Sequence, residues 1–291
     1  MSSTHPIISV TGSSGAGTTS VRRTFEYIFR REKIVAAFIE GDAFHRYDRE
    51  HMRRVMADEA QQGNRHFSHF GPRANLLAEL EESFSQYGRT GTCRTRHYIH
   101  DAQESRQYDA LPGTFTDWET IGTGTDLLFY EGLHGCTVTD DVNIARHADI
   151  RLGVVPVVNL EWIQKIHRDQ DTRGYSTEAV VDTILRRMPD YANFICPQFS
   201  QTHVNFQRVP TVDTSNPFIA QWIPTAEESM VVVRFANPRG IDFPYLLSMI
   251  GGSMMSRANS LVVPGGKLDL AMQLILTPLI LQLLEKKRRA A

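Results

Sequence analysis

The sequence has little cysteine and no excess of charge of either sign, and each shortage argues against a class of protein. Only three cysteines occur in 291 residues, at positions 93, 136 and 196. They are odd in number and far apart, which argues against a disulfide framework and a metal-ligand motif. The net charge of −2 at pH 7 offers no positive field for a nucleic-acid backbone. We therefore expect reduced thiols and no nucleic-acid partner.

Long apolar runs are also missing. The first residues, Met1 to Pro6, lack the basic segment and apolar run of a signal peptide, so we expect a cytoplasmic protein. The most apolar stretch, Leu270 to Leu284, is interrupted by polar residues and is too short to cross a bilayer. We interpret 267–288 as a buried C-terminal helix that bends at Pro278 and ends in a basic run. We expect no membrane partner, although a surface anchor is the alternative interpretation of that basic run.

The apolar residues that are present predict an α/β fold. Hydrophobic residues make up 41% of the chain, which is enough for a sizeable core. Between the first two predicted strands, Val21, Phe25, Ile28 and Phe29 recur at helical spacing. Strand, helix and strand in this order predict a mostly parallel sheet covered by helices. Short runs rich in β-branched residues predict strands at 7–10, 35–39, 127–130, 150–158 and 230–235.

No clear linker divides the chain, so we expect a single domain over 1–291 with insertions. Further helices are predicted at 160–168 and at 177–188, the second ended by Pro189. The polar segment 168–174 between them has the composition of a mobile loop, so we predict a lid near 165–175. Short apolar runs and prolines predict a smaller β-rich region at about 193–265.

The segment after the first predicted strand has the position of a phosphate-binding loop. Glycines at its first and sixth places allow backbone N–H groups to wrap a phosphate, and the following helix adds a partial positive charge. Thr19 occupies the place whose hydroxyl reaches a magnesium ion. The glycine spacing does not fit a dinucleotide-binding loop, and a purely structural turn is the alternative. The segment consists of Gly12, Ser13, Ser14, Gly15, Ala16, Gly17, Thr18 and Thr19.

Thr18 stands where a phosphate-binding loop normally has lysine. Because phosphoryl transfer requires positive charge at the β- and γ-phosphates, another cation must supply it. Lys165 and Arg168 lie on or beside the predicted lid, and Arg173 closes it. We predict that Lys165 reaches over the nucleotide, and the alternative is a solvated lysine on an exposed helix face.

Three acidic residues are candidates for proton transfer and metal binding. Asp42 follows the second predicted strand and should emerge at the carboxyl edge of the sheet, near the phosphate loop. We predict that Asp42 is the base that accepts an alcohol proton, although an aspartate after a strand is often a turn or cap residue. Glu131 ends an apolar strand as in a Walker B motif, and Asp169 lies in the predicted lid. We assign both to the metal side, and the sequence leaves the division of roles among the three acids open.

Basic residues cluster after Asp42, in a composition that suits an anionic sugar phosphate. His45, Arg46, Arg49 and Arg53 follow within one short stretch. His100 lies in a second basic and aromatic segment, where an exposed histidine without function is equally consistent with the sequence.

Taken together, the chain resembles the bacterial phosphoribulokinase family over essentially its whole length. The matching segments are GSSGAGT, IEGDAFHR, FYEGLHG, VVPVVNLEWIQKIHRD and NPRGIDFPYL. The resemblance implies a P-loop, nucleoside-monophosphate-kinase-like fold and phosphorylation of the C1 hydroxyl of ribulose 5-phosphate by ATP with Mg²⁺ in the Calvin cycle. It also implies that Asp42 is the base. The residues that would meet the sugar phosphate are His45, Arg49, Arg53, His100 and Arg173.

The resemblance also implies regulation. Bacterial family members share the threonine at the lysine position, are typically octamers, and respond to NADH as an activator and to AMP as an inhibitor. Arg31, Arg234 and Arg257 match positions associated with that control. Plant-type members use a cysteine in the phosphate loop for redox control, whereas this chain has Ala16 there and no cysteine before Cys93. We therefore expect a homo-oligomer under effector control and no thioredoxin switch.

Two other functions remain open from the sequence. Uridine and pantothenate kinases share the architecture, so a different hydroxyl acceptor is one alternative. A nucleotide-sensing regulator without turnover is the other, and the absent loop lysine keeps it open. The retained acids and Lys165 argue against the regulator, because a sensor needs no proton acceptor.

Overall fold

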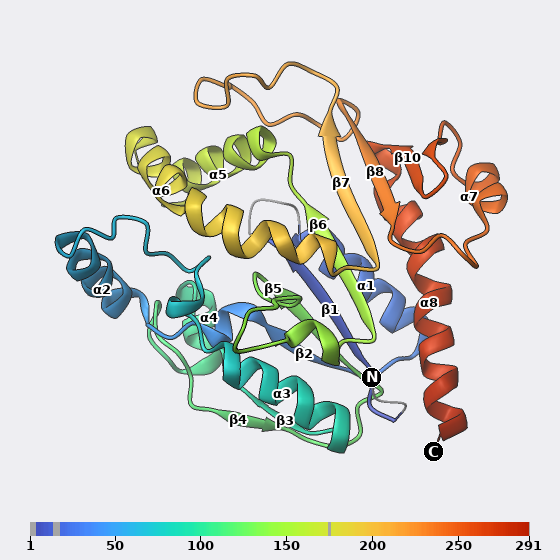
Figure 1. The fold of residues 1–291 in the computed structure, drawn as a ribbon, viewed down its shortest axis with the longest axis horizontal. Coiled ribbons are helices and arrows are strands. Elements are labelled where there is room, and N and C mark those ends of the chain that lie inside the picture. Colours follow the sequence, from blue (N-terminus) through green and yellow to red (C-terminus); the bar gives the residue numbers. More distant parts are fainter. Residues whose placement is uncertain (1–3, 14–17, 174–175, 291) are drawn as a thin grey trace.

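The computed structural model describes residues 4–13, 18–173 and 176–290 of the chain. Its centre is an eight-stranded sheet with the strand order β2-β5-β1-β6-β7-β8-β10-β9 (Figure 1). Neighbouring strands from β2 to β7 run parallel, and the pairs from β7 to β9 run antiparallel. The predicted class, a mainly parallel α/β fold, is therefore confirmed.

The five strands that the β-branched runs predicted, β1, β2, β5, β6 and β8, lie within a few residues of the predicted ranges. Parallel strands carry their side chains alternately on the two faces of the sheet, and here both faces are covered by helices. The strand bounds are β1 (Ile7–Gly12), β2 (Ala36–Glu40), β5 (Leu127–Gly132), β6 (Ile150–Val155), β7 (Val204–Pro210), β8 (Ser229–Phe235), β9 (Met254–Arg257) and β10 (Ser260–Pro264), with a separate pair β3 (Cys93–Thr95) and β4 (Glu119–Ile121).

Helices on opposite faces bury alternate residues of the same strands. On one face, Ile8 packs with α1 (Thr18–Glu32) and α8 (Leu268–Ala290), whereas Ile7 packs on the other face with α3 (Leu77–Thr90). Figure 1 shows α1 and α8 side by side, far from α3. The other helices are α2 (Arg49–Gln61), α4 (Ala102–Tyr108), α5 (Val158–Arg173), α6 (Thr177–Asp190) and α7 (Phe243–Met249).

The C-terminal helix α8 lies within two residues of the predicted range 267–288. It is longer than the apolar stretch Leu270 to Leu284 on which the expectation of no membrane span was based, and Gly265–Ala290 is long and apolar enough to span a bilayer by length and composition. One face of α8 is nevertheless buried against the sheet, at Ala271, Met272, Ile275, Leu276, Ile280 and Leu284. Core helices of globular domains pass the same composition test, so the packed face supports the interpretation of α8 as a core helix.

The predicted polar loop at 168–174 is wrong for residues 168–173, because α5 continues to Arg173. Asp169 is only 3% exposed and pairs with Lys165 one turn earlier and with Arg168. An ion pair at this spacing stabilises the helix, so polar composition alone was misleading. Gly174 lies outside the described residues. The strand predicted to reach residue 158 ends at Val155, because Pro156 has no N–H to offer to a neighbouring strand.

The β-rich region predicted at about 193–265 begins later than expected, at β7, and its strands belong to the central sheet. α6 continues through Pro189 to Asp190, and a π-helix (Tyr191–Ile195) and a 3₁₀ helix (Cys196–Ser200) follow. β7 then pairs in parallel with β6, so the later strands extend the central sheet. A pairing between strands so far apart in the chain leaves no local pattern that a sequence analysis can detect.

The packing of α1 against β5 gives a test of the core. Phe25 is fully buried, with its ring centroid 4.7 Å from that of Phe129 and 5.6 Å from that of Phe29. Phe25→Ala should lower the free energy of unfolding by about 3–5 kcal/mol, because a large cavity replaces the ring. Tyr27 on the same helix is 50% exposed, so Tyr27→Ala should change the free energy of unfolding by only about 0.5 kcal/mol. Denaturant unfolding of both variants measures this, and equal losses would contradict the assigned packing.

Candidate active site

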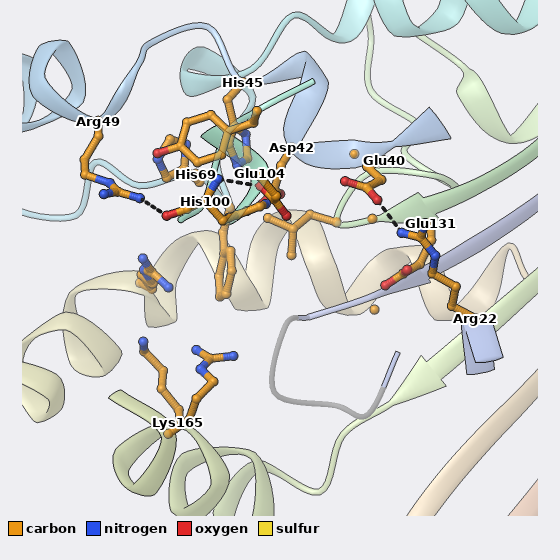
Figure 2. Close-up of a pocket in the computed structure, with 18 residues that line it drawn as sticks. Arg22, Glu40, Asp42, His45, Arg49, His69, His100, Glu104, Glu131 and Lys165 are labelled. Carbon is orange, nitrogen blue, oxygen red and sulfur yellow. Dashed lines mark hydrogen bonds and ion pairs between the residues drawn. The ribbon is translucent and has the colours of Figure 1, made fainter. Parts of the chain in front are cut away.

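A cavity of about 730 Å³ lies at the carboxyl ends of β1, β2 and β5. Gly12, Gly41 and Gly132 line it from these strand ends. Figure 2 shows side chains entering it from several elements, with Asp42 and Lys165 on opposite sides. In open α/β sheets, ligands bind outside the carboxyl ends of the strands, so this cavity lies where a substrate site is expected.

Two glycines bring the ends of β2 and β5 into close contact. A Cβ atom on Gly132 would lie 2.6 Å from the Cα of Gly41, and one on Gly41 would lie 2.8 Å from the Cα of Gly132. The hydroxyl of Tyr130 fills the remaining space, at 2.6 Å and 2.7 Å from these two Cβ positions. Only glycine fits at both places, so the segments Gly41-Asp42 and Glu131-Gly132 are held side by side at the cavity.

Asp42 is an ionised carboxylate that faces the cavity. It lies in the first turn of the 3₁₀ helix Gly41–Phe44, directly after β2. Its Oδ1 is 3.2 Å from Nε2 of His45 and its Oδ2 is 3.6 Å from Nε2 of His100. Burial alone would raise the pKa of Asp42, but the neighbouring His45, together with His100, lowers it well below its usual range. Because 38% of its side chain stays accessible within the cavity, Asp42 can meet a substrate there.

The cavity wall on the side of α5 and α6 is cationic. Lys165 and Arg168 line it from α5, and Arg187 lines it from α6. Burial, with the nearby Arg187, lowers the pKa of Lys165 to about 8, although the carboxylate of Asp169 favours the charged form. A lysine in such a setting is a cation held ready at low cost of reorganisation, which suits a group that must neutralise phosphate charge.

Carboxylates and an arginine gather at the other end of the cavity. Glu131 and Glu40 line it, and Arg22 of α1 donates a hydrogen bond to Glu40 and another to Glu26 (Figure 2). Next to Gly12, Ser13 donates from its hydroxyl to the buried carboxylate of Glu161 on α5. Thus α5 is tied to the first turn of the predicted phosphate loop.

Eight of the residues singled out in the sequence meet at this one cavity. Those that line it are Gly12, Asp42, His45, Arg49, His100, Glu131, Lys165 and Arg168. Arg53 is exposed on α2 and does not line the cavity, and neither does Asp169, which is buried in its ion pairs with Lys165 and Arg168 on α5. Outside the described part of the chain lie Ser14, Gly15, Ala16 and Gly17, and also the side chains of Thr18, Thr19 and Arg173.

Several residues at the cavity were missed in the sequence. Arg187 belongs to the basic pair Arg186-Arg187 near the end of a predicted helix, a signal that was available but resembles an ordinary solvated helix end. Tyr98 lies within the basic and aromatic segment that contains His100. His69, Glu40, Glu104 and Arg22 carried no usable sequence signal. All six line the cavity.

The three arginines associated with effector control lie away from this cavity. Arg31 on α1 pairs with Glu32 and donates a hydrogen bond of 3.0 Å to the hydroxyl of Thr277 on α8. Arg234 on β8 and Arg257 on β9 are exposed and are both in register with Ser260 of β10. None of them lines the cavity around Asp42, so any effect on the reaction would be indirect.

Comparisons with known proteins agree with this geometry. The chain is 71% identical over 286 residues to a phosphoribulokinase of Nitrobacter vulgaris, which covers 98% of this chain and 99% of that protein. It is 69% identical to the phosphoribulokinase of Xanthobacter flavus over the full length of both chains. The solved structure of phosphoribulokinase from Rhodobacter spheroides superposes with a TM-score of 0.91 at 61% identity and covers 99% of this chain and 100% of that chain.

The family-level comparison covers most of the chain. The profile of the phosphoribulokinase / uridine kinase family matches residues 7–215, a range that contains all the cavity residues described above. With this match, the full-length relatives and the shared fold, the chain belongs to the phosphoribulokinase / uridine kinase family.

Proposed function

We propose that this enzyme transfers the γ-phosphoryl group of ATP to the C1 hydroxyl of ribulose 5-phosphate and forms ribulose 1,5-bisphosphate, a step of the Calvin cycle. The observation that carries the proposal is Asp42, an ionised carboxylate at the sheet edge that faces a cation-lined cavity beside the phosphate loop. Relatives up to 71% identical that are named phosphoribulokinase support the choice of sugar. Asp42 accepts the hydroxyl proton as the oxygen attacks phosphorus.

The sugar phosphate is held by the basic groups around Asp42. Arg49 lines the cavity and donates a hydrogen bond of 3.0 Å to the backbone carbonyl of His100, so it fixes the segment that carries that histidine. His45 and His100 flank the base itself. Guanidinium and imidazolium groups suit a phosphate dianion. In this proposal Arg53 and Arg173 join the same anion when the sugar is bound.

Lys165 and Arg168 supply the positive charge that the phosphate loop lacks. Lys165 lies across the cavity from Asp42 (Figure 2), and Arg168 lines the same cavity from α5, so the transferred phosphoryl group would pass between these cations and Asp42. Their partner Asp169 holds both cations in place through its two oxygens. Such preorganised charge stabilises the transition state because little reorganisation is needed at the moment of transfer.

The residues fit a magnesium ion bound together with the nucleotide. Mg²⁺ usually keeps several waters and takes only one or two protein carboxylates besides substrate phosphates. Among the described residues there is no group of three acidic, histidine or cysteine side chains that would make a closed metal site. Glu131 at the cavity would hold the ion with Thr19, the other predicted ligand, and the ion would neutralise phosphate charge. Asp169, which was also predicted on the metal side, pairs with Lys165 and Arg168 and does not line the cavity, so it would act through these two cations.

Regulation and assembly belong to the same proposal. We propose that NADH activates the enzyme and AMP inhibits it through Arg31, Arg234 and Arg257, and that the protein forms a homo-oligomer, with an octamer as the expected size. The proposal also places the protein in the cytoplasm, where ATP and sugar phosphates are available. The exposure of Arg234 on β8 and of Arg257 on the edge strand β9 suits contact with an anionic effector or a second copy.

The substrate and the base can be tested together. With ATP and Mg²⁺, we expect rapid ADP formation with ribulose 5-phosphate and none with uridine or pantothenate in a coupled assay. Asp42→Asn should lower kcat by about 10²–10⁴-fold, because the proton acceptor is lost. The exposed Asp58→Asn on α2 is the matched control and should keep normal turnover. Turnover with uridine instead, no turnover at all, or a fully active Asp42→Asn would each contradict the proposal.

The role of Lys165 predicts a pH dependence. Since the pKa of Lys165 is lowered to about 8, the charged form is present below this pH and is lost above it. We therefore expect kcat/KM to fall as the pH rises through about 8. Lys165→Met should lower kcat by roughly 10²-fold or more at every pH, because a transition-state cation is missing. Lys165→Arg keeps its charge and should lack the alkaline fall. Near-normal turnover of Lys165→Met would refute the role.

Effector control has its own measurement. NADH should raise the initial rate at low ribulose 5-phosphate, AMP should lower it, and Arg257→Ala should weaken the response to NADH. Steady-state rates across effector concentrations check this. If NADH changes neither the rate nor the cooperativity of the intact protein, the regulatory part of the proposal is wrong.

A further inference from the structure

Behind Asp42, on the side away from the open cavity, lies a buried amide that the reaction described above does not use. Asn75 follows the 3₁₀ helix Pro72–Ala74 and is 2% exposed. It pairs with His45 as an isolated antiparallel bridge, and its Oδ1 lies 2.8 Å from Nδ1 of His45. The ring of His45 thus connects Asn75 to Asp42, the proposed base.

The surrounding groups fix which way the Asn75 amide points. Its Nδ2 donates to the backbone carbonyl of His69 at 2.8 Å and to that of Gly71 at 2.7 Å. A carbonyl oxygen can only accept, so the reversed amide would set its own oxygen against two others. With both amide hydrogens committed, the oxygen is the atom left for His45, and it too can only accept.

His45 therefore lies between two groups that cannot donate a proton to it. Its Nδ1 faces the amide oxygen of Asn75 at 2.8 Å, and its Nε2 faces Oδ1 of Asp42 at 3.2 Å. A neutral imidazole carries one N–H and one lone pair, and the lone pair would then point at an oxygen. Protons on both ring nitrogens satisfy both contacts, and the ring is then an imidazolium beside an ionised carboxylate.

The other rings of this cluster fit a single positive charge on His45. His69 stacks on His45, with ring centroids 3.9 Å apart and planes 25° apart. Burial, then the charge of His45, lowers the pKa of His69 well below its usual range. Burial likewise lowers the pKa of His134, next to Asn75, to about 4. These two histidines are neutral, so they add no second charge to the buried cluster.

We propose that Asn75 is a positioning residue, which holds His45 as an imidazolium and through it keeps Asp42 ionised and aimed into the cavity. The proposal rests on the proposed function, in which Asp42 receives the alcohol proton. An amide oxygen is too weak a base to take a proton from His45. The cluster therefore sets the charge beside Asp42 and does not relay protons away from it. The charged and titratable groups that also face this pair are His69, His100, His134, Tyr130, Arg187 and Lys165, and Arg96 donates to the backbone carbonyl of His45.

The protonation of His45 can be observed without any reaction. In protein labelled with ¹⁵N at the histidine rings, His45 is assigned by the signals missing from His45→Gln. At neutral pH we expect both ring nitrogens of His45 to show the chemical shifts of an imidazolium. A pyridine-like nitrogen at His45 would overturn the proposal. Because no substrate is added, this result is independent of whether ribulose 5-phosphate is the acceptor.

Two variants of Asn75 separate a positioning role from a structural one. Asn75→Leu removes the acceptor, so His45 should become neutral. The midpoint of the acid limb in the pH profile of kcat/KM should then move to higher pH by roughly one to three units, because Asp42 loses a cation within hydrogen-bonding distance. Asn75→Asp keeps an acceptor at the same place, and it should retain the imidazolium spectrum and the wild-type acid limb. Both variants lose the two bonds to backbone carbonyls, so both should be less stable to heat.

The outcomes divide cleanly. The positioning role is supported if the midpoint of the acid limb moves to higher pH in Asn75→Leu and stays at the wild-type pH in Asn75→Asp. Equal loss of activity and stability in both variants, with the acid limb unmoved, overturns it and leaves Asn75 as a structural residue. If Asn75→Leu does not fold, the ¹⁵N spectrum of the unmodified protein decides, because an imidazolium at His45 supports the proposal and a neutral ring contradicts it.

Discussion

The parallel pairing of β1, β2 and β5 is the constraint on which the rest of the site depends. Because the three strands run in one direction, their carboxyl ends meet at one edge of the sheet, with Thr11 in register with Gly132 and Glu40 with Glu131. That edge holds the start of the phosphate loop, the proposed base and the acid of the metal side. The glycine pair at the ends of β2 and β5 then brings their backbones close enough for one substrate to reach all three.

Charge is distributed across the cavity in a way that suits transfer between two anions. The proposed base is ionised because cations surround it, and the opposite wall carries Lys165, Arg168 and Arg187. A kinase site must bring together a triphosphate and a sugar phosphate that repel each other, so the protein has to supply positive charge on both sides. In the proposed function, α5, which is tied to Ser13 through Glu161, would supply the positive charge that the phosphate loop lacks, because Lys165 and Arg168 line the cavity from this helix.

The parts of this site that could be predicted are those that a short stretch of sequence identifies by itself. Asp42 and Glu131 were identified because each follows an apolar run, and the ends of parallel strands must meet. Asn75 could not be identified in this way, since its meaning comes from a bridge to His45 and from carbonyls of its own loop. The loop conformation predicted at 168–173 was wrong because the charges of α5 pair with one another within a helix, and composition does not distinguish this from a solvated loop. The place of the late strands in the sheet could not be predicted, because β7 joins β6 across a long stretch of chain.

The central claim is that the carboxyl edge of the sheet is where nucleotide and sugar meet. A crystal structure with a non-hydrolysable ATP analogue, Mg²⁺ and ribulose 5-phosphate tests it most directly. The account predicts the γ-phosphate between the loop after β1 and the cations of α5, and the C1 hydroxyl within hydrogen-bonding distance of Asp42. Nucleotide density away from the loop after β1, or a sugar whose C1 lies out of reach of Asp42, would contradict the account.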